Sequence, residues 1–194
     1  MRVCASAANP RDGKPRHGMF LGTGAISEAT RFCQTVFNAR GVKGNWASFA
    51  TLAGAVSRAL FTAPDPTDLA RFDRPYPISV TSEGTPHATG DQLLLLSTTL
   101  DRLILGTQPF WGGKQAPIRT TIFPYPVPNI LRWLLPALYG GEMRKAPPGA
   151  TSFTSGSLEI ATPVSFVLDG EFFDPPENEA LRIETGPVFA YIRG

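Results

Sequence analysis

The sequence predicts a single α+β domain: a β-sandwich-like body of mostly antiparallel strands, with a helical pair near the N-terminus and one further helix. Its 194 residues, 42% of them hydrophobic, are enough for one domain with a real hydrophobic core. Proline and glycine number 19 each, which favours many turns over a helical bundle. The C-terminal half consists of short apolar runs split by these turn residues, a spacing typical of a sandwich or barrel.

The N-terminal third is expected to hold two strands and then the helical pair. Residues 2–6 are predicted as a short edge strand, and 17–24 as a strand that ends in glycines. Apolar residues spaced by three and four predict a first helix over about 25–38 and a second over about 46–61. Asn45 is a suitable N-cap for the second helix, which ends at a proline-containing segment.

Most of the remaining chain is predicted to form strands. The nearly continuous apolar run at 91–99 has the length of a strand and is expected to be buried on both faces. We expect 103–107 to continue or pair with that strand, and 129–139 to form the further helix. Other strands are predicted at 76–82, 118–123, 151–155, 157–162, 165–168, 171–173, 180–185 and 188–193.

Charge, cysteine content and hydropathy limit the classes of protein to which this chain can belong. A net charge of +2 without a basic stripe argues against nucleic-acid binding. Arg11, Lys14 and Arg16 form one small basic group, which is either solvated or a contact for anionic head groups. Cys4 and Cys33 are expected to be buried free thiols, because two cysteines make no disulfide framework. With neither a signal peptide nor 18 consecutive apolar residues in the sequence, we expect a cytoplasmic protein.

The most informative local sequence is F-V-L-D-G-E-F-F at 166–173. Asp169 and Gly170 between two apolar runs predict a two-residue hairpin turn, because such turns need positive φ at both central residues. On this interpretation Asp169 is a turn residue and Glu171 begins the next strand. A carboxylate held at a turn can also accept a proton from a substrate hydroxyl, so a catalytic role stays open.

Two glycine-containing segments are weaker candidates for binding sites. G-T-Q-P-F-W-G-G-K at 106–114 lacks the phosphate-loop spacing and is either a loop of packing aromatics or the rim of an apolar ligand site. F-L-G-T-G at 20–24 favours close helix–strand packing over anion binding at the following helix N-terminus. No Cys, His, Asp and Glu set has metal-ligand spacing, so we predict no metal site.

The order of these motifs resembles the C-terminal domain of the diacylglycerol kinase, sphingosine kinase and bacterial lipid kinase family. The resemblance rests on H-G-M-F-L-G-T-G before two helices, on L-L-L-L-S-T-T-L-D-R-L-I-L-G-T-Q-P-F-W-G-G-K-Q-A-P, and on the L-D-G-E turn before two last strands. It covers most of the chain, so the whole of 1–194 is expected to be one such domain.

This resemblance implies that the chain is the lipid-substrate lobe of a two-lobed enzyme. In such kinases an N-terminal lobe binds ATP through a Gly-Gly-Asp-Gly-Thr-type loop, and with Mg²⁺ the γ-phosphate passes to a lipid hydroxyl. The acid of the turn carries over to Glu171 as the proton acceptor, with Asp169 orienting it or a metal-bound water. The implied lipid-binding elements are the 25–38 helix face and Phe110, Trp111, Gly112 and Gly113.

Two departures from the family limit what carries over. The sequence contains no Gly-Gly-Asp-Gly-Thr loop, so ATP and Mg²⁺ are expected for the complete kinase and not for this chain, which should be inactive alone. Residues 116–126 contain no acid, so the magnesium site of bacterial relatives is not carried over. We expect a lipid substrate, a separate ATP-binding lobe and transient contact at the periphery of the inner membrane. The alternatives are a non-catalytic module that binds lipid or another apolar ligand, and a structural or interaction domain.

Overall fold

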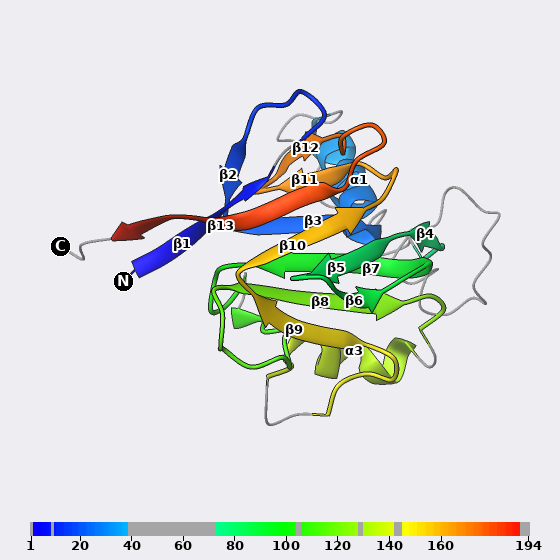
Figure 1. Cartoon of the computed structure of the whole chain (residues 1–194). Coiled ribbons are helices and arrows are strands. Elements are labelled where there is room, and N and C mark those ends of the chain that lie inside the picture. The colour runs from blue at the N-terminus through cyan, green and yellow to red at the C-terminus, as the bar shows by residue number, and fades with distance from the viewer. Residues whose placement is uncertain are drawn as a thin grey trace.

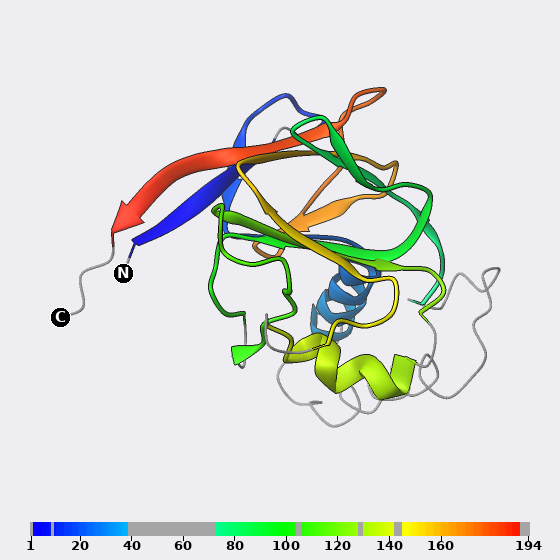
Figure 2. The same ribbon diagram turned by 60° about the horizontal axis from the view of Figure 1, so that its bottom comes forward.

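Two antiparallel sheets pack face to face in the computed structural model, and helices cover the outer face of the second sheet (Figures 1 and 2). The structure describes residues 2–8, 10–38, 73–103, 106–127, 130–141 and 145–190. The predicted α+β, sandwich-like architecture is confirmed. The second predicted helix, at 46–61, lies outside the described residues.

The first sheet has six strands in the order β2-β1-β13-β10-β5-β6. The strand predicted at 2–6 is not an edge strand, because β1 lies between β2 and β13. The two last strands, predicted at 180–185 and 188–193, are one strand through residue 190, since a bulge opposite β1 accommodates Gly186 and Pro187. The bounds are β1 (Arg2–Ala8), β2 (Arg16–Gly18), β5 (Ser79–Ser82), β6 (Thr85–Ala88), β10 (Ser157–Ala161) and β13 (Leu181–Ala190).

The second sheet has seven strands, six of them in the order β12-β11-β3-β7-β8-β9, and the seventh, β4, also pairs with β7. The strand predicted at 17–24 is two strands, because the chain passes at Met19 from the first sheet into the second. The bounds are β3 (Phe20–Gly24), β4 (Tyr76–Pro77), β7 (Asp91–Thr98), β8 (Ile118–Pro124), β9 (Thr151–Ser155), β11 (Phe166–Leu168) and β12 (Glu171–Phe173).

The segment after β7 turns back instead of forming the strand predicted at 103–107. The backbone N–H of Leu103 donates to the carbonyl of Thr107 at 2.9 Å, and that of Gly106 donates to the carbonyl of Leu103 at 3.1 Å. These short-range bonds use the groups that a strand would offer to a neighbouring strand, so the described part of this segment is a turn.

Two described helices lie on the outer face of the second sheet (Figure 2): α1 (Ala25–Asn38) and α3 (Ile130–Leu138). Directly before α1, Gly24 has a φ of +72°, and the Ser27 hydroxyl donates to its carbonyl at 2.8 Å. A Cβ at Gly22 would overlap the side chain of Ile26, so the absence of that atom lets α1 lie close to β3. The predicted close helix–strand packing at 20–24 is therefore confirmed.

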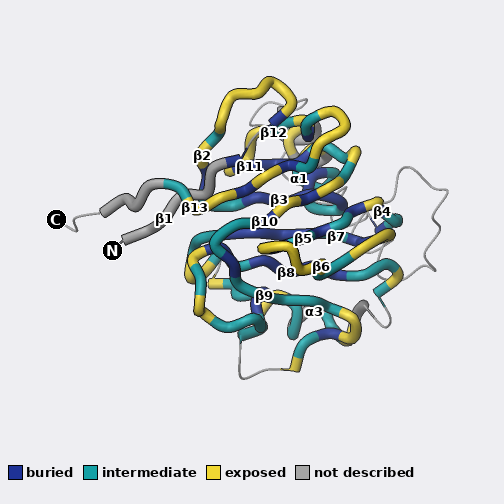
Figure 3. Tube along the Cα trace, viewed as in Figure 1, coloured by how far each residue is buried: buried dark blue, intermediate teal, exposed yellow. Residues whose placement is uncertain are grey.

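The hydrophobic core lies between the two sheets, where buried side chains of both inner faces meet. Strand residues alternate between faces, so Leu95 of β7 belongs to this core while Leu94 and Leu96 face the helices. The second sheet is thus apolar on both faces, as the leucine run at 91–99 predicted. Figure 3 shows its central strands as mostly buried and the loops near β2 and β12 as exposed.

Candidate functional site

The β11–β12 hairpin has the two-residue turn that the sequence predicts. Leu168 pairs with Glu171, which leaves Asp169 and Gly170 as the turn residues. Their φ angles are 47° and 94°, so both adopt the left-handed backbone that a primed turn requires. The hairpin forms the edge of the second sheet, and its tip is exposed to solvent.

The carboxylate of Asp169 ties this hairpin to the corner between β2 and β3. Its two oxygens accept the backbone N–H groups of Met19 and Phe20, each at 2.9 Å. In return the backbone N–H of Asp169 donates to the carbonyl of Phe20 at 2.9 Å. A Cβ on Gly18 would lie 2.9 Å from a carboxylate oxygen, so this glycine makes room for the clamp. Both Asp169 oxygens are therefore engaged in holding the fold.

Glu171 is the exposed carboxylate of the hairpin. Within the described part of the chain, its side chain takes part in no hydrogen bond or ion pair. The guanidinium carbon of Arg31 in α1 lies 5.1 Å from the centre of the ring of Phe172, the next residue. Phe173 instead stacks on Phe166 beside the core, with the two ring centres 5.7 Å apart. Because side chains alternate, Glu171 is on the face of Phe173, away from α1. A carboxylate that is both exposed and unpaired can accept a proton from a substrate.

An apolar cavity of about 290 Å³ lies between the second sheet and the helices. Twelve of the thirteen residues that line it are apolar, and Thr107 is the exception. The sheet contributes leucines of β7 with Phe20 and Phe123, and the helices contribute Ile26 and Trp133. Walls of this kind favour a hydrocarbon ligand over a polar one.

The hairpin tip and the cavity meet at a single residue. Phe20 offers its backbone N–H to the Asp169 carboxylate, and the same residue lines the cavity. In addition, the side-chain amide of Gln34 in α1 donates to the carbonyl of Gly170 at 2.9 Å. The carboxylate-bearing turn, the first helix and the apolar cavity are thus parts of one connected structure.

The four loop residues implied to bind lipid are not among the residues that line the cavity. Among the described residues of the loop 106–117, Thr107 and Pro109 line the cavity, whereas Phe110, Trp111, Gly112 and Gly113 do not. Phe110 is buried, and Gly113 has a φ of +81° and packs on Gln115. This loop therefore shapes the cavity without presenting these side chains to it.

Trp111 supports the wall through Phe123. The two rings meet edge to face, with centroids 6.2 Å apart, and Phe123 lines the cavity. The backbone N–H groups of Trp111 and Gly112 donate to the hydroxyl of Ser152 in β9, at 2.9 and 3.2 Å. The loop is thereby fastened to the edge of the second sheet.

Sequence reasoning found part of this cavity and missed the rest. Ile26 lies on the predicted face of the 25–38 helix, while the side chains of the later face residues Phe32, Cys33, Val36 and Phe37 lie outside the described residues. Leu96 was expected to be buried as part of the apolar run at 91–99, whereas Phe123 and Trp133 were assigned only to a strand and a helix. Periodicity does not distinguish a filled core from a cavity. Only the spacing between α3 and the sheet reveals which of them face open space.

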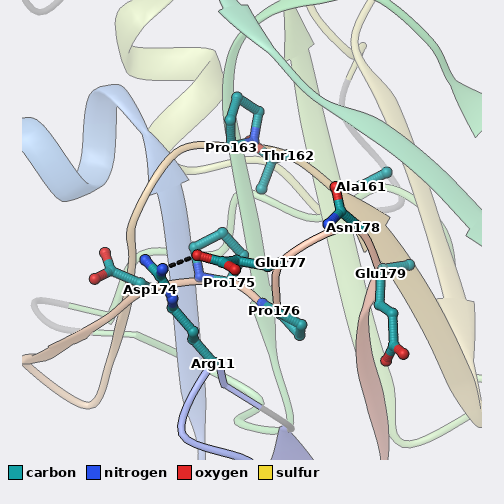
Figure 4. A pocket seen from close by; sticks show the side chains of 11 residues that line it. Arg11, Ala161, Thr162, Pro163, Asp174, Pro175, Pro176, Glu177, Asn178 and Glu179 are labelled. Carbon is teal, nitrogen blue, oxygen red and sulfur yellow. Dashed lines mark ion pairs between the residues drawn. The ribbon is translucent and has the colours of Figure 1, made fainter.

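A second pocket, of about 590 Å³, lies beside the loop that follows β12 and has a charged wall. Asp174, Glu177 and Glu179 are among its lining residues, and Arg11 forms an ion pair with Glu177 (Figure 4). The Ser165 hydroxyl donates to Asp174 at 2.7 Å. Although this pocket is the larger, its carboxylates make it unsuitable for a hydrocarbon chain.

The described residues do not fit a magnesium site. They contain no group of three His, Cys, Asp or Glu side chains placed to hold a metal ion. Asp169, whose carboxylate accepts the backbone N–H of the cavity-lining Phe20, already has both oxygens bound to backbone N–H groups. Neither described helix is long and apolar enough to cross a membrane.

Comparison with known proteins shows similarity in fold. No family model matches the chain, and no curated protein matches it in sequence. A diacylglycerol kinase structure from Bacillus anthracis strain Sterne matches with a TM-score of 0.53 and 11% identity, covering 95% of this chain and 50% of that chain. Two more structures from that strain, also assigned as diacylglycerol kinases, give TM-scores of 0.54 and 0.53 at 12% identity, covering 97% of this chain and 54% of theirs. The chain therefore spans about half the length of these proteins and shares the fold of that half.

Proposed function

We propose that this chain is the lipid-substrate lobe of a diacylglycerol kinase-like enzyme. The observation that carries the proposal is the apolar cavity of about 290 Å³. It lies in a fold that this chain shares with about half the length of a diacylglycerol kinase structure. Small-molecule sites commonly enclose about 300–1,000 Å³, so this cavity is at their lower end. Such a volume suits one hydrocarbon chain, with the lipid hydroxyl left outside the apolar walls.

In the proposed reaction, the lipid hydroxyl oxygen forms a bond to phosphorus while the bond from that phosphorus to the nucleotide breaks. The hydroxyl proton passes to the Glu171 carboxylate. The phosphoryl group would come from ATP on a second lobe, since this sequence has no glycine-rich phosphate loop. This chain would hold the hydrocarbon, keep water from it and place Glu171, while Asp169 keeps the hairpin in position.

The assignment of Glu171 is tested by Glu171→Gln in the full kinase, with both lobes present. The amide cannot accept the proton, so kcat for lipid phosphorylation is expected to fall about 10²–10⁴-fold with little change in lipid binding. Glu184→Gln is the matched control, because Glu184 is an exposed glutamate on β13 in the other sheet. Unchanged phosphorylation by Glu171→Gln would show that this residue is not the base.

The role of the cavity is tested separately, by one substitution in each of two opposite walls. Leu96→Trp fills it from the sheet and Ala137→Leu fills it from α3, since both residues line it. Each variant is expected to lose lipid that co-purifies with the wild-type chain, as measured by mass spectrometry, while circular dichroism verifies the fold. If both variants are folded and still retain the lipid, the cavity is not its site.

A non-catalytic lipid-binding module is the second candidate. Its support is the apolar cavity, whose walls suit a hydrocarbon chain whether or not a phosphoryl group is transferred. On this alternative, the cavity variants lose lipid as before, but the wild-type chain supports no lipid phosphorylation when an ATP-binding lobe is supplied. The pair of experiments therefore separates the two functions.

A further inference from the structure

Charge is distributed unevenly along the chain. Residues 92–158 contain six Lys or Arg and two Asp or Glu, whereas 169–179 contain five Asp or Glu and no Lys or Arg. The first segment builds β8, β9 and α3 at one edge of the second sheet, and the second segment builds the β11–β12 hairpin end at the opposite edge (Figure 1). The acids of 169–179 therefore gather at the hairpin edge, where Arg11 pairs with Glu177, and we call the opposite edge, formed by β8, β9 and α3, the basic side.

The basic side also carries the most exposed apolar surface. Leu138 and Tyr139, at the C-terminal end of α3, are 40% and 39% exposed, and they are the exposed large hydrophobic side chains among the described residues. Leu138 lines the apolar cavity as well. The cavity wall thus continues onto the surface at this point, which is how a site for an apolar ligand meets the environment that supplies it.

The loop after β7 brings cations to this exposed end of α3. Gln108 connects the two, because its backbone N–H donates to the carbonyl of Leu138 at 2.9 Å and its side-chain amide donates to the carbonyl of Asp101 at 3.3 Å. Arg102 follows Asp101 directly. Lys114 lies close enough to Asp101 to lower the pKa of its carboxyl, although the hydrogen bond from Arg119 is the largest cause.

Arg119 neutralises the acid at this position. Its guanidinium forms an ion pair with Asp101 and donates to the carbonyl of Leu100 at 3.3 Å, and its side chain is only 13% exposed. Arg102 and Lys114 are exposed, and neither forms an ion pair within the described part of the chain. Two exposed cations are therefore left on the loop that Gln108 joins to the end of α3.

We propose that Arg102, Lys114, Leu138 and Tyr139 form a rim face that docks on an anionic lipid surface. Cationic side chains are attracted to anionic head groups, and an aliphatic and an aromatic side chain between them can enter the interfacial layer. This inference deepens the proposed lipid-binding function and rests on it. The cavity wall extends from Leu138 at the rim to Phe20 beside the hairpin, so a lipid chain that enters at the rim face reaches the hairpin end of the cavity without crossing water.

The electrostatic part is tested by co-sedimentation with phosphatidylcholine vesicles, with and without phosphatidylglycerol at about 30%. The wild-type chain is expected to prefer the anionic vesicles, and salt should weaken this preference. Arg102→Gln with Lys114→Gln should weaken binding to them about 25-fold, at about fivefold for each charge near the surface. The matched control is Arg11→Gln with Lys14→Gln, which removes two exposed cations from the other basic group and should leave binding within about twofold.

The apolar part is tested with Tyr139→Ser, which should weaken binding to both kinds of vesicle, and with Tyr139→Trp, which should preserve it. Three results would overturn the proposal. The rim and control double variants could lose vesicle binding equally, or the wild-type chain could show no preference for anionic vesicles. The third is a rim face that is covered by a second copy of the chain in solution.

Leu96→Trp separates this inference from the proposed function, because the larger side chain should displace lipid from the cavity and leave vesicle binding unchanged. If the wild-type chain does not bind vesicles but still holds lipid in its cavity, the rim face is wrong and the proposed lipid-binding function stands.

Discussion

Asp169 links three parts of the molecule through one side chain. Its backbone adopts the positive φ of the turn, its carboxylate holds the N–H groups of Met19 and Phe20, and Phe20 lines the cavity. The sequence predicts its place in the turn, because Asp-Gly favours that backbone locally. Its clamp on a strand about 150 residues earlier is a tertiary contact that no local pattern announces.

Replacing Asp169 with glycine isolates the contribution of the carboxylate. Glycine adopts the turn backbone without strain, so the change removes the acceptor of two N–H groups and little else. We expect the free energy of unfolding to fall by about 1–2 kcal/mol, measured by urea denaturation. Asn178→Gly is the matched control, since Asn178 also has a positive φ of 60° and should change stability by less than about 0.5 kcal/mol. An equal loss in both variants would mean that the clamp contributes nothing.

At the scale of secondary-structure elements, a single glycine determines how closely α1 packs on the second sheet. Helix periodicity predicts the bounds 25–38, and the structure has α1 over these residues. Its distance from β3 depends on Gly22, where a side chain would overlap Ile26. Since Ile26 lines the cavity, the same glycine determines how closely the helix covers that space.

Gly22→Ala is expected to push α1 away from β3. The added methyl group overlaps a β-branched side chain with few alternative rotamers, so the free energy of unfolding should fall by about 1–3 kcal/mol. The double variant with Ile26→Ala should be less destabilised than the sum of the two single variants, by about 0.5–3 kcal/mol. Urea denaturation of all four proteins measures this coupling, and strict additivity would show that the two side chains do not compete for space.

The whole molecule combines a sandwich core with a separate apolar space outside it. The core residues between the sheets stabilise the fold, while the face of the second sheet toward the helices is left to line the cavity. Around this plan, five acids lie at 169–179 by the hairpin, and the exposed cations Arg102 and Lys114 lie on the loop that Gln108 joins to the end of α3. These features together support the proposed lipid-binding function.

Occupation of the cavity should stabilise the whole molecule, because a ligand that binds only the folded state shifts the unfolding equilibrium. Monooleoylglycerol at about 100 times its Kd would add about 2.7 kcal/mol. For a chain of this size, that corresponds to a rise in Tm of about 5–10 °C. Differential scanning fluorimetry measures the shift, with the folded Leu96→Trp variant as the control. An equal shift in that variant would place the ligand outside the cavity.

The sequence alone determined the local elements of this protein: the α+β class, the bounds of α1, the leucine-rich strand at 91–99 and the Asp169-Gly170 turn. These depend on periodicity and on backbone preferences that each short segment carries by itself. The tertiary structure alone decided that β1 is an inner strand, that β13 continues through a bulge, and that Phe110 to Gly113 are not among the residues that line the cavity. Strand partners and open spaces arise between segments distant in the chain, so their positions exist only once the sheets and helices have packed.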